Sequence, residues 1–410
     1  MRSAGAIEEA EIELTSEPIP TCAAIPTATV VGTESALVAM EGDAAKATRL
    51  AVDVEASGMF AYRARACTVQ LAWNDAERIV VVDALAVPVS SLGGLLGGDG
   101  PVKVIHDVAF DARLLAEQGV DLDNVHDTAI AAQMLGRSAT GLASLLQSEL
   151  GVSVDKGMQH HDWRLRPLDE AMLRYLSEDV AHLEALESAL WGQLAQHGIE
   201  DAVIEETRYR LSCARQAIQT PNQAPAYVRI KGMEQLPAAD LAALRALADL
   251  REIEAQHIDI PPQHLLSNAT LMLLARSRLR DPHAIARLPA VAASSLGSGF
   301  VNRLAEAMTG AGPDVPDADR VWLDRPRIPL EIAQARRRRE ARVGQWRKTE
   351  AARRCVCEQV VLPGHCLKDL AQTAVETIED LARIKGIGEF RVIRDGEAML
   401  QALHATDDAV

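Results

Sequence analysis

The sequence has few aromatic side chains: phenylalanine, tryptophan and tyrosine make up only 3% of its 410 residues. Because 48% of the residues are nonetheless apolar, aliphatic side chains and alanine must fill the core, and the length is enough for two or three domains. No stretch approaches the roughly 20 apolar residues that span a bilayer. The first residues are acidic and do not form a basic and apolar leader, so we expect a soluble, cytoplasmic protein without membrane contact.

Cysteine is scarce, and the six cysteines are scattered without the spacing of a disulfide framework. A zinc site could be suggested from Cys355, Cys357, His365 and Cys366. The Cys-x-Cys spacing in an arginine-rich helical run argues against it, because neighbouring thiols two apart point to different sides of a helix. We therefore expect free thiols in a reducing compartment.

Positive charge is also in short supply: 42 Lys and Arg face 58 Asp and Glu, a net charge of −16. This excludes a protein that coats nucleic acid with its whole surface, but binding follows local potential and a local basic patch can still act. Residues 325–354 form such a patch, with eleven Lys or Arg against three Glu. A solvated helix face with internal ion pairs is one interpretation of the run. In an acidic protein we favour a surface that faces phosphates.

The chain divides into an acidic start, a mixed region and a helical region. Residues 1–30 are acidic and then rich in Pro, Thr and Ala, which indicates a disordered arm. Strand patterns interleaved with and followed by helical ones predict a mixed α/β domain over residues 31–216. The expected elements are a helix over 34–47, strands over 49–55, 66–73, 78–83 and 102–105, and helices from 109 to about 216.

The region beyond residue 220 is helical and contains an internal repeat. Leu250-Arg251 and Glu254-Ala255 reappear 96 residues later as Trp346-Arg347 and Glu350-Ala351. The pattern Ile285-Ala-Arg-Leu returns at Leu381 with the same offset. A constant offset predicts a duplicated helical module, over residues 228–309 and 328–406, with a proline-containing linker over 310–327.

Carboxylates in the first half are spaced so that they can converge. Asp53 and Glu55 end an apolar strand and point to one face of it, because side chains two apart in a strand share a face. Asp111 opens an apolar helix, and Tyr175 and Asp179 are four apart on another helix and share its face. Four acids brought together must take up protons or bind cations. Oxygen ligands favour Mg²⁺ or Mn²⁺, and two such ions about 4 Å apart can clamp the attacking and leaving oxygens of a phosphodiester.

Three motifs surround these acids: Asp53-Val54-Glu55, His106-Asp107-Val108-Ala109-Phe110-Asp111, and Arg174-Tyr175-Leu176-Ser177-Glu178-Asp179. In order, spacing and flanks they resemble the DEDD 3′–5′ exonucleases with a tyrosine in the third motif, and within these the bacterial ribonuclease D family. The resemblance implies an α/β ribonuclease H-like exonuclease domain, with a mixed central sheet flanked by helices. It also implies that the two helical modules are all-α HRDC-type domains.

The resemblance assigns roles to the acids. Asp53, Glu55, Asp111 and Asp179 would bind two divalent metal ions, Mg²⁺ or Mn²⁺, and Tyr175 would orient or deprotonate the attacking water. Within the second motif we favour Asp111 as the ligand, with Asp107 as a neighbour on the substrate side. Asp127, before the next helix, is expected to cap that helix or to support the ligands from behind, and not to bind metal itself.

The implied activity is hydrolysis of RNA from its 3′ end to nucleoside 5′-monophosphates, as in the maturation of tRNA precursors or other structured small RNAs. We expect a monomer, since no coiled-coil pattern is present. The side chains expected to contact nucleic acid come from the motif flanks and the helical modules: His106, Asp107, Trp163, Arg166, Lys231, Arg336, Arg337, Arg338, Arg339, Arg347 and Lys348.

Two alternatives stay open at this point. The same motifs serve exonucleases that act on DNA, and the contact to the 2′-hydroxyl that separates RNA from DNA has no linear signature. A nucleic-acid-binding scaffold with an inactive nuclease domain is disfavoured, because no expected ligand is missing.

Overall fold

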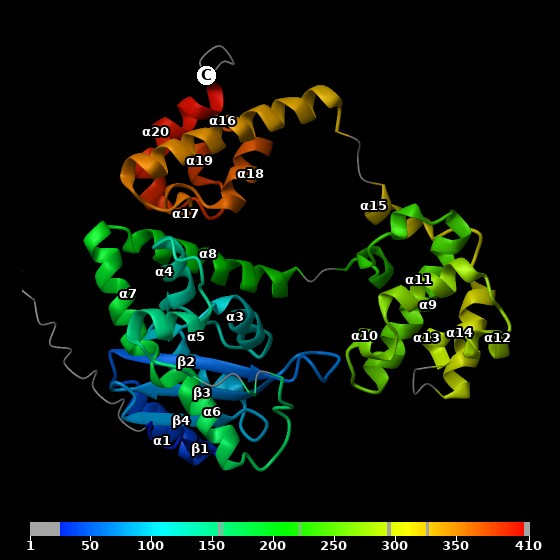
Figure 1. The fold of residues 1–410 in the computed structure, drawn as a ribbon, viewed down its shortest axis with the longest axis horizontal. Helices are drawn as coiled ribbons and strands as arrows, with labels where there is room; N and C mark the ends of the chain where they lie inside the picture. The colour runs from blue at the N-terminus through cyan, green and yellow to red at the C-terminus, as the bar shows by residue number, and fades with distance from the viewer. Residues whose placement is uncertain are drawn as a thin grey trace, which may run out of the picture.

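The computed structural model describes residues 25–405, apart from 155–156, 159, 221–222, 293–296 and 325–327. It contains an α/β domain followed by two helical domains (Figure 1). The predicted fold class, a mixed sheet flanked by helices and then all-helical domains, is confirmed. Most of the predicted acidic arm, residues 1–24, lies outside the described residues.

A six-stranded sheet forms the centre of the α/β domain, with the order β1-β4-β3-β2-β5-β6. The strands β2, β3 and β4 are antiparallel neighbours, while β5 and β6 run parallel to β2 on one side and β1 runs parallel to β4 on the other. The four predicted strands are present with ends that agree within one residue. The sequence did not predict β1 or β6, which are three residues long and too short to show alternation. The bounds are β1 (Thr29–Val31), β2 (Arg49–Ala56), β3 (Ala66–Trp73), β4 (Arg78–Asp83), β5 (Val102–Ile105) and β6 (Val125–Asp127).

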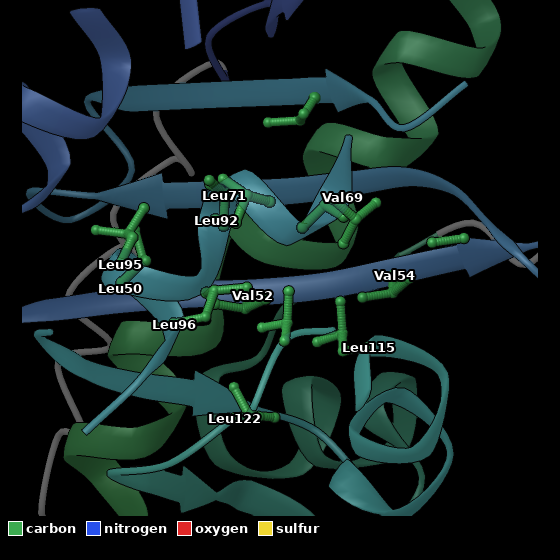
Figure 2. Packing of buried hydrophobic residues seen from close by; sticks show 14 of the residues in the cluster. Leu50, Val52, Val54, Val69, Leu71, Leu92, Leu95, Leu96, Leu115 and Leu122 are labelled. Atoms are coloured by element: carbon green, nitrogen blue, oxygen red, sulfur yellow. The ribbon is translucent and has the colours of Figure 1, made fainter. Parts of the chain in front are cut away.

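Alternation along β2 decides which side of the sheet carries the acids. Leu50, Val52 and Val54 point into one hydrophobic core, where they meet leucines of the segments that follow β4 and β5 (Figure 2). Because successive side chains of a strand point to opposite faces, Asp53 and Glu55 point to the other face. The helix α6 packs on that side, across β2, β3 and β4.

Eight α-helices belong to the described part of the α/β domain. The predicted helix at residue 34 ends three residues earlier than expected, and α3 packs against the long α8. The bounds are α1 (Glu34–Ala44), α2 (Gly93–Leu96), α3 (Val108–Glu117), α4 (Thr128–Met134), α5 (Leu142–Leu145), α6 (Glu170–Ala181), α7 (Leu183–His197) and α8 (Glu200–Gln219).

The two helical domains repeat each other, as the sequence predicted. The helices α10 and α17 begin 96 residues apart and have equal lengths, and the same is true of α12 and α19. The first domain contains α9 (Ala238–His257), α10 (Pro262–Leu265), α11 (Asn268–Ser277), α12 (Pro282–Ala286), α13 (Pro289–Ala292) and α14 (Ser298–Gly310). After α15 (Arg320–Leu323), the second contains α16 (Leu330–Arg354), α17 (Glu358–Val361), α18 (Gly364–Gln372), α19 (Ile378–Ala382) and α20 (Glu389–His404).

Each helical domain contacts the α/β domain at a different place. The second domain lies on α8, where Arg391 pairs with Glu205 at 3.1 Å. The first domain meets the connection between β2 and β3, which extends toward α10 (Figure 1). There the Tyr62 hydroxyl donates to the Glu252 carboxylate at 3.0 Å. Among the described residues, no helix combines the length and the apolar character needed to cross a membrane.

Candidate active site

The candidate site lies at one edge of the sheet, where β2, β5 and β6 run parallel and end together. Sites of α/β proteins commonly lie outside the carboxyl ends of such strands. Asp53 and Glu55 lie at the end of β2, Asp107 follows β5, and Asp127 is the last residue of β6. The topology therefore gathers acids that are up to 74 residues apart in the sequence.

Three carboxylates form the centre of the site. One oxygen from each of Asp53, Glu55 and Asp179 lies within 4.8 Å of the other two. Asp179 comes from α6, which packs on the face of β2 that carries the two other acids. Since Mg²⁺ and Ca²⁺ bind oxygens at about 2.0–2.6 Å, oxygens at this separation can share one cation.

Burial and mutual repulsion disfavour the ionised form of these carboxylates and raise their pKa values. Burial, together with the charges of Asp53, Asp179 and Asp111, raises the pKa of Glu55 to about 9. Burial and the charge of Asp53 raise the pKa of Asp179 to about 8. Burial raises the pKa of Asp53 itself to about 6. Such a cluster is stabilised either by protons or by a cation, and an all-oxygen donor set suits a hard divalent ion. The residues therefore fit a divalent metal site.

Asp111 lies beside this trio, whereas Asp107 does not join it. The Asp111 side chain is buried, and burial and the charge of Asp53 raise its pKa well above the usual value. Asp107 is exposed and takes a left-handed backbone conformation, with φ 62°, at the start of α3. The structure thus turns Asp111 toward the carboxylates and leaves Asp107 at the surface.

Asp127 acts as a double helix cap, which confirms the expectation that it is a cap. Its carboxylate accepts hydrogen bonds from the backbone N–H groups of Ala129 and Ile130 at 2.8 and 3.0 Å, at the start of α4. It also accepts from the N–H groups of Asp107 and Val108 at 3.3 and 2.8 Å, at the start of α3. Asp127 therefore fixes the helix that carries Asp111.

Tyr175 precedes Asp179 by one turn of α6 and packs on Trp163, with ring centroids 5.6 Å apart. The indole is only 1% exposed, so the structure does not bring Trp163 to a surface where RNA could touch it. Trp163 instead packs against the ring of Tyr175 and supports its position.

Arg166 was also expected at the substrate, and its five N–H donors are all taken by the protein. Two go to Asp83 at 2.7 and 2.8 Å, and three go to the carbonyls of Cys67, Trp163 and Leu165, each at 2.8 Å. The guanidinium therefore anchors the segment before α6 to the sheet. Its place does not fit the expected nucleic-acid contact.

His106 likewise faces the protein. Its Nδ1 lies 2.9 Å from the Thr128 hydroxyl, and burial lowers its pKa to about 4. The imidazole is therefore neutral near pH 7 and offers no positive charge to a phosphate.

The basic residues of the helical domains that were expected to contact nucleic acid differ in how exposed they are. Lys231, Arg337, Arg338 and Lys348 are exposed, and Arg336 and Arg339 are half-buried. Arg347 is only 9% exposed and donates to the Glu358 carbonyl at 3.0 Å, so it supports its own domain. Near the end of α16, Glu350 pairs with both Arg353 and Arg354. Part of the positive charge predicted for this run is thus neutralised within the domain.

The sequence interpretation missed the connection between β2 and β3, residues 57–65. It begins just after Glu55 and carries Tyr62, which contacts the first helical domain. A usable signal was present, since Arg63 and Arg65 stand between two strands of a domain that is otherwise acidic.

Comparisons with protein families match most of the chain. The model of a 3′–5′ exonuclease family matches residues 28–195, and that of the HRDC domain matches residues 240–308 and 337–403. The second HRDC match agrees with the predicted repeat.

Individual proteins agree with these matches. The chain is 30% identical over 287 residues to ribonuclease D of Zymomonas mobilis subsp. mobilis, covering 68% of this chain and 72% of that one. It is 30% identical over 266 residues to ribonuclease D of Gluconacetobacter diazotrophicus, covering 63% and 66%.

Two solved structures share the fold over nearly their whole length. A protein from Bifidobacterium adolescentis matches with a TM-score of 0.72 and 22% identity, over 93% of this chain and 97% of that one. RNase D of Escherichia coli, described as an exoribonuclease involved in structured RNA processing, matches with a TM-score of 0.64 and 20% identity, over 92% and 98%.

Proposed function

Because this chain belongs to the ribonuclease D family of 3′–5′ exoribonucleases, we propose that it shortens RNA from the 3′ end by metal-dependent hydrolysis. The products are nucleoside 5′-monophosphates. The observation that carries the proposal is the trio Asp53, Glu55 and Asp179, whose oxygens converge within 4.8 Å beside the buried Asp111.

The four carboxylates would hold two divalent ions, Mg²⁺ or Mn²⁺. When bound, such ions supply positive charge to the phosphate oxygens and lower the pKa of an attacking water. The carboxylates keep their places because α6 packs on one face of β2 and α3 shares the core on the other face of that strand. Tyr175, whose ring packs on Trp163, would orient the attacking water through its hydroxyl or, as the phenolate, take up the proton of that water.

We further propose that the natural substrates are structured small RNAs, such as tRNA precursors, and that the protein acts in the cytoplasm as a monomer. Two helical domains beside a nuclease domain support a polymer substrate, since a linked binding module raises the effective concentration of RNA at the site. The proposed domain limits are 31–216 for the nuclease, 228–309 and 328–406 for the HRDC domains, and 310–327 for the linker. Buried Ala28 and strand β1 favour a start of the nuclease domain at about residue 28.

The test is a digestion of RNA that is labelled at its 5′ end, with Mg²⁺ or Mn²⁺. We expect a ladder that shortens one nucleotide at a time and no cleavage of a circular RNA of the same sequence. Asp179→Asn should lower the rate by at least 10³-fold, whereas Glu389→Gln, at the distant start of α20, should not. Full activity of Asp179→Asn would refute the proposal. Faster digestion of the matched DNA strand would instead favour the DNA exonuclease alternative.

A further inference from the structure

A polar cavity of about 480 Å³ lies where the connection between β2 and β3 meets the first helical domain. It is of the size that proteins use to bind small ligands. Three guanidinium groups and one carboxylate line it, from Arg63, Arg229, Arg251 and Glu252. We call it the arginine cavity. Its lining is positive although the chain as a whole carries a net charge of −16.

Arg251 is the most deeply placed of the three, with only 4% of its surface exposed. Its Nη1 donates to the Leu266 carbonyl at 2.9 Å and to the Asn268 side chain at 2.8 Å. The Glu252 carboxylate is 3.8 Å away, too far for a hydrogen bond, and the Nε has no acceptor among the described residues. The Arg251 guanidinium thus has one carboxylate beside it, beyond hydrogen-bond distance, and one buried donor without an acceptor, and an anion in the cavity would satisfy that donor.

Arg63 and Arg229 stand at the exposed side of the same cavity. Neither makes an ion pair with any residue that the structure describes. Burial and the neighbouring Glu252 raise the pKa of Tyr62, and the positive charges of Arg63 and Arg229 oppose that rise. Burial lowers the pKa of Arg251, the charge of Glu252 opposes that fall, and the charge of Arg229 adds to it. The guanidiniums are therefore close enough to affect one another.

In the second helical domain, a carboxylate lies beside the arginine that corresponds to Arg251. With the repeat offset of 96 residues, Arg347 corresponds to Arg251 and Glu358 corresponds to Pro262. The Glu358 carboxylate lies 3.4 Å from the Arg347 guanidinium. The first domain has a proline at this position, so Arg251 lacks the carboxylate that pairs with Arg347 and has the more distant Glu252, at 3.8 Å, as its ion-pair partner.

We propose that the arginine cavity binds a backbone phosphate of the RNA strand, several nucleotides upstream of the 3′ end. Guanidinium groups suit this ligand because their paired N–H donors match two phosphate oxygens. Tyr62 follows Glu55 by seven residues, so the cavity lies at most about 25 Å along the chain from the carboxylates. As part of the proposal, a strand whose 3′ end is at the carboxylates contacts the cavity through an upstream phosphate, and we expect a dinucleotide to be too short for this contact.

This inference rests on the proposed function, and it predicts a dependence on RNA length. The variants are Arg63→Ala, Arg229→Ala and Pro262→Glu, the last of which introduces the carboxylate of the second domain. Arg65→Ala and Arg276→Ala are matched controls, since Arg65 is exposed in the same connection, Arg276 is exposed on α11 of the same helical domain, and neither lines the cavity. Binding of a fluorescent single-stranded 12-nucleotide RNA is measured by anisotropy without divalent metal. Hydrolysis of a dinucleotide and of the 12-mer is measured with Mg²⁺.

We expect each of the three variants to bind the 12-mer about 10-fold more weakly, with a logarithmic salt dependence smaller by about 0.7 for each lost contact. Hydrolysis of the dinucleotide should be unchanged in these three variants. The two control variants should bind the 12-mer and hydrolyse both RNAs as the unmodified protein does. Equal losses for the dinucleotide and the 12-mer, or equal losses in the controls, would overturn the proposal. So would inorganic phosphate binding that depends on Arg229 while 12-mer binding does not, since that result indicates a site for a free anion. If the unmodified protein fails to shorten any RNA but Arg229→Ala still weakens 12-mer binding, the proposed function fails and the phosphate site stands.

Discussion

The indole ring of Trp163 lies behind the phenol ring of Tyr175, with the centroids 5.6 Å apart and the planes tilted by 32°. Trp163 is 1% exposed, while Tyr175 is half-buried one turn before Asp179. Trp163 therefore supports the ring of Tyr175, which shares a face of α6 with Asp179. Substitutions at the two rings should affect different properties of the protein.

Tyr175→Phe removes only a hydroxyl, whereas Trp163→Ala removes the indole ring that packs against Tyr175. If the hydroxyl handles the proton of the attacking water, Tyr175→Phe should lower kcat by about 10²- to 10⁴-fold. Its urea unfolding midpoint should hardly change. Trp163→Ala should lower the free energy of unfolding by about 3–5 kcal/mol, through the cavity that it leaves. Parallel kinetics and urea titrations check both, and a Tyr175→Phe enzyme with normal kcat would exclude the hydroxyl from catalysis.

The choice between Asp111 and Asp107 can be tested with a pair of asparagine variants. Asp111 is buried beside Asp53, so Asp111→Asn should weaken Mg²⁺ binding and lower kcat by at least 10²-fold. Asp107 is exposed, and Asp107→Asn should retain Mg²⁺ binding measured by calorimetry. The reverse pattern would show that the metal ligand was assigned to the wrong acid.

The raised pKa values of the carboxylates predict how stability depends on pH when no metal is present. The ordinary pKa of Glu55 is 4.5 and the folded value is about 9, and Asp179 rises from 3.8 to about 8. Between these values the folded state binds more protons than the unfolded state, so the free energy of unfolding falls as pH rises. The slope is at most about 1.4 kcal/mol per pH unit for each acid. Urea titrations in EDTA at pH 6 and pH 8.5 measure it, and Glu55→Gln should flatten the dependence.

The same protonation predicts that metal binding releases protons near pH 7, because the ligands must be ionised to hold the ion. Calorimetric titration with Mg²⁺ in two buffers of different ionisation enthalpy measures the number released. Identical heats in both buffers would mean that the carboxylates are already ionised in the metal-free protein.

Regular periodicity was enough to predict much of the fold and the centre of the site. Alternation in β2 predicted that Asp53 and Glu55 share a face, and the structure confirms that their oxygens converge with Asp179. The 96-residue offset predicted a duplication that appears in the matching bounds of α10 and α17 and of α12 and α19. The roles of Asp53, Glu55 and Asp179 as metal ligands remain predictions.

What the sequence could not show are the contacts between distant residues. Arg166 was expected to contact nucleic acid, but two of its donors bind Asp83, 83 positions away. Trp163 was expected to contact nucleic acid as well, yet it fills a core. Tyr62 carried no motif, and its partner Glu252 is 190 positions away. Local patterns do not encode such distances, so basic and aromatic residues near a motif cannot be divided into substrate contacts and structural anchors before the fold is known.

We expect the buried Arg391 to contribute to the attachment of the second helical domain to α8. Its side chain is fully buried and pairs with Glu205 of α8 at 3.1 Å, while its Nε donates to the Val360 carbonyl at 3.1 Å. Arg391→Ala leaves Glu205 half-buried without its partner, and loss of one member of a buried pair costs about 3–5 kcal/mol. We therefore expect a lower unfolding midpoint and faster proteolysis between α8 and α16. Arg383→Ala is the control, because that arginine is exposed and pairs only locally with Asp380. If Arg391→Ala were as stable as this control, the contact between α20 and α8 would contribute little to holding the domain in place.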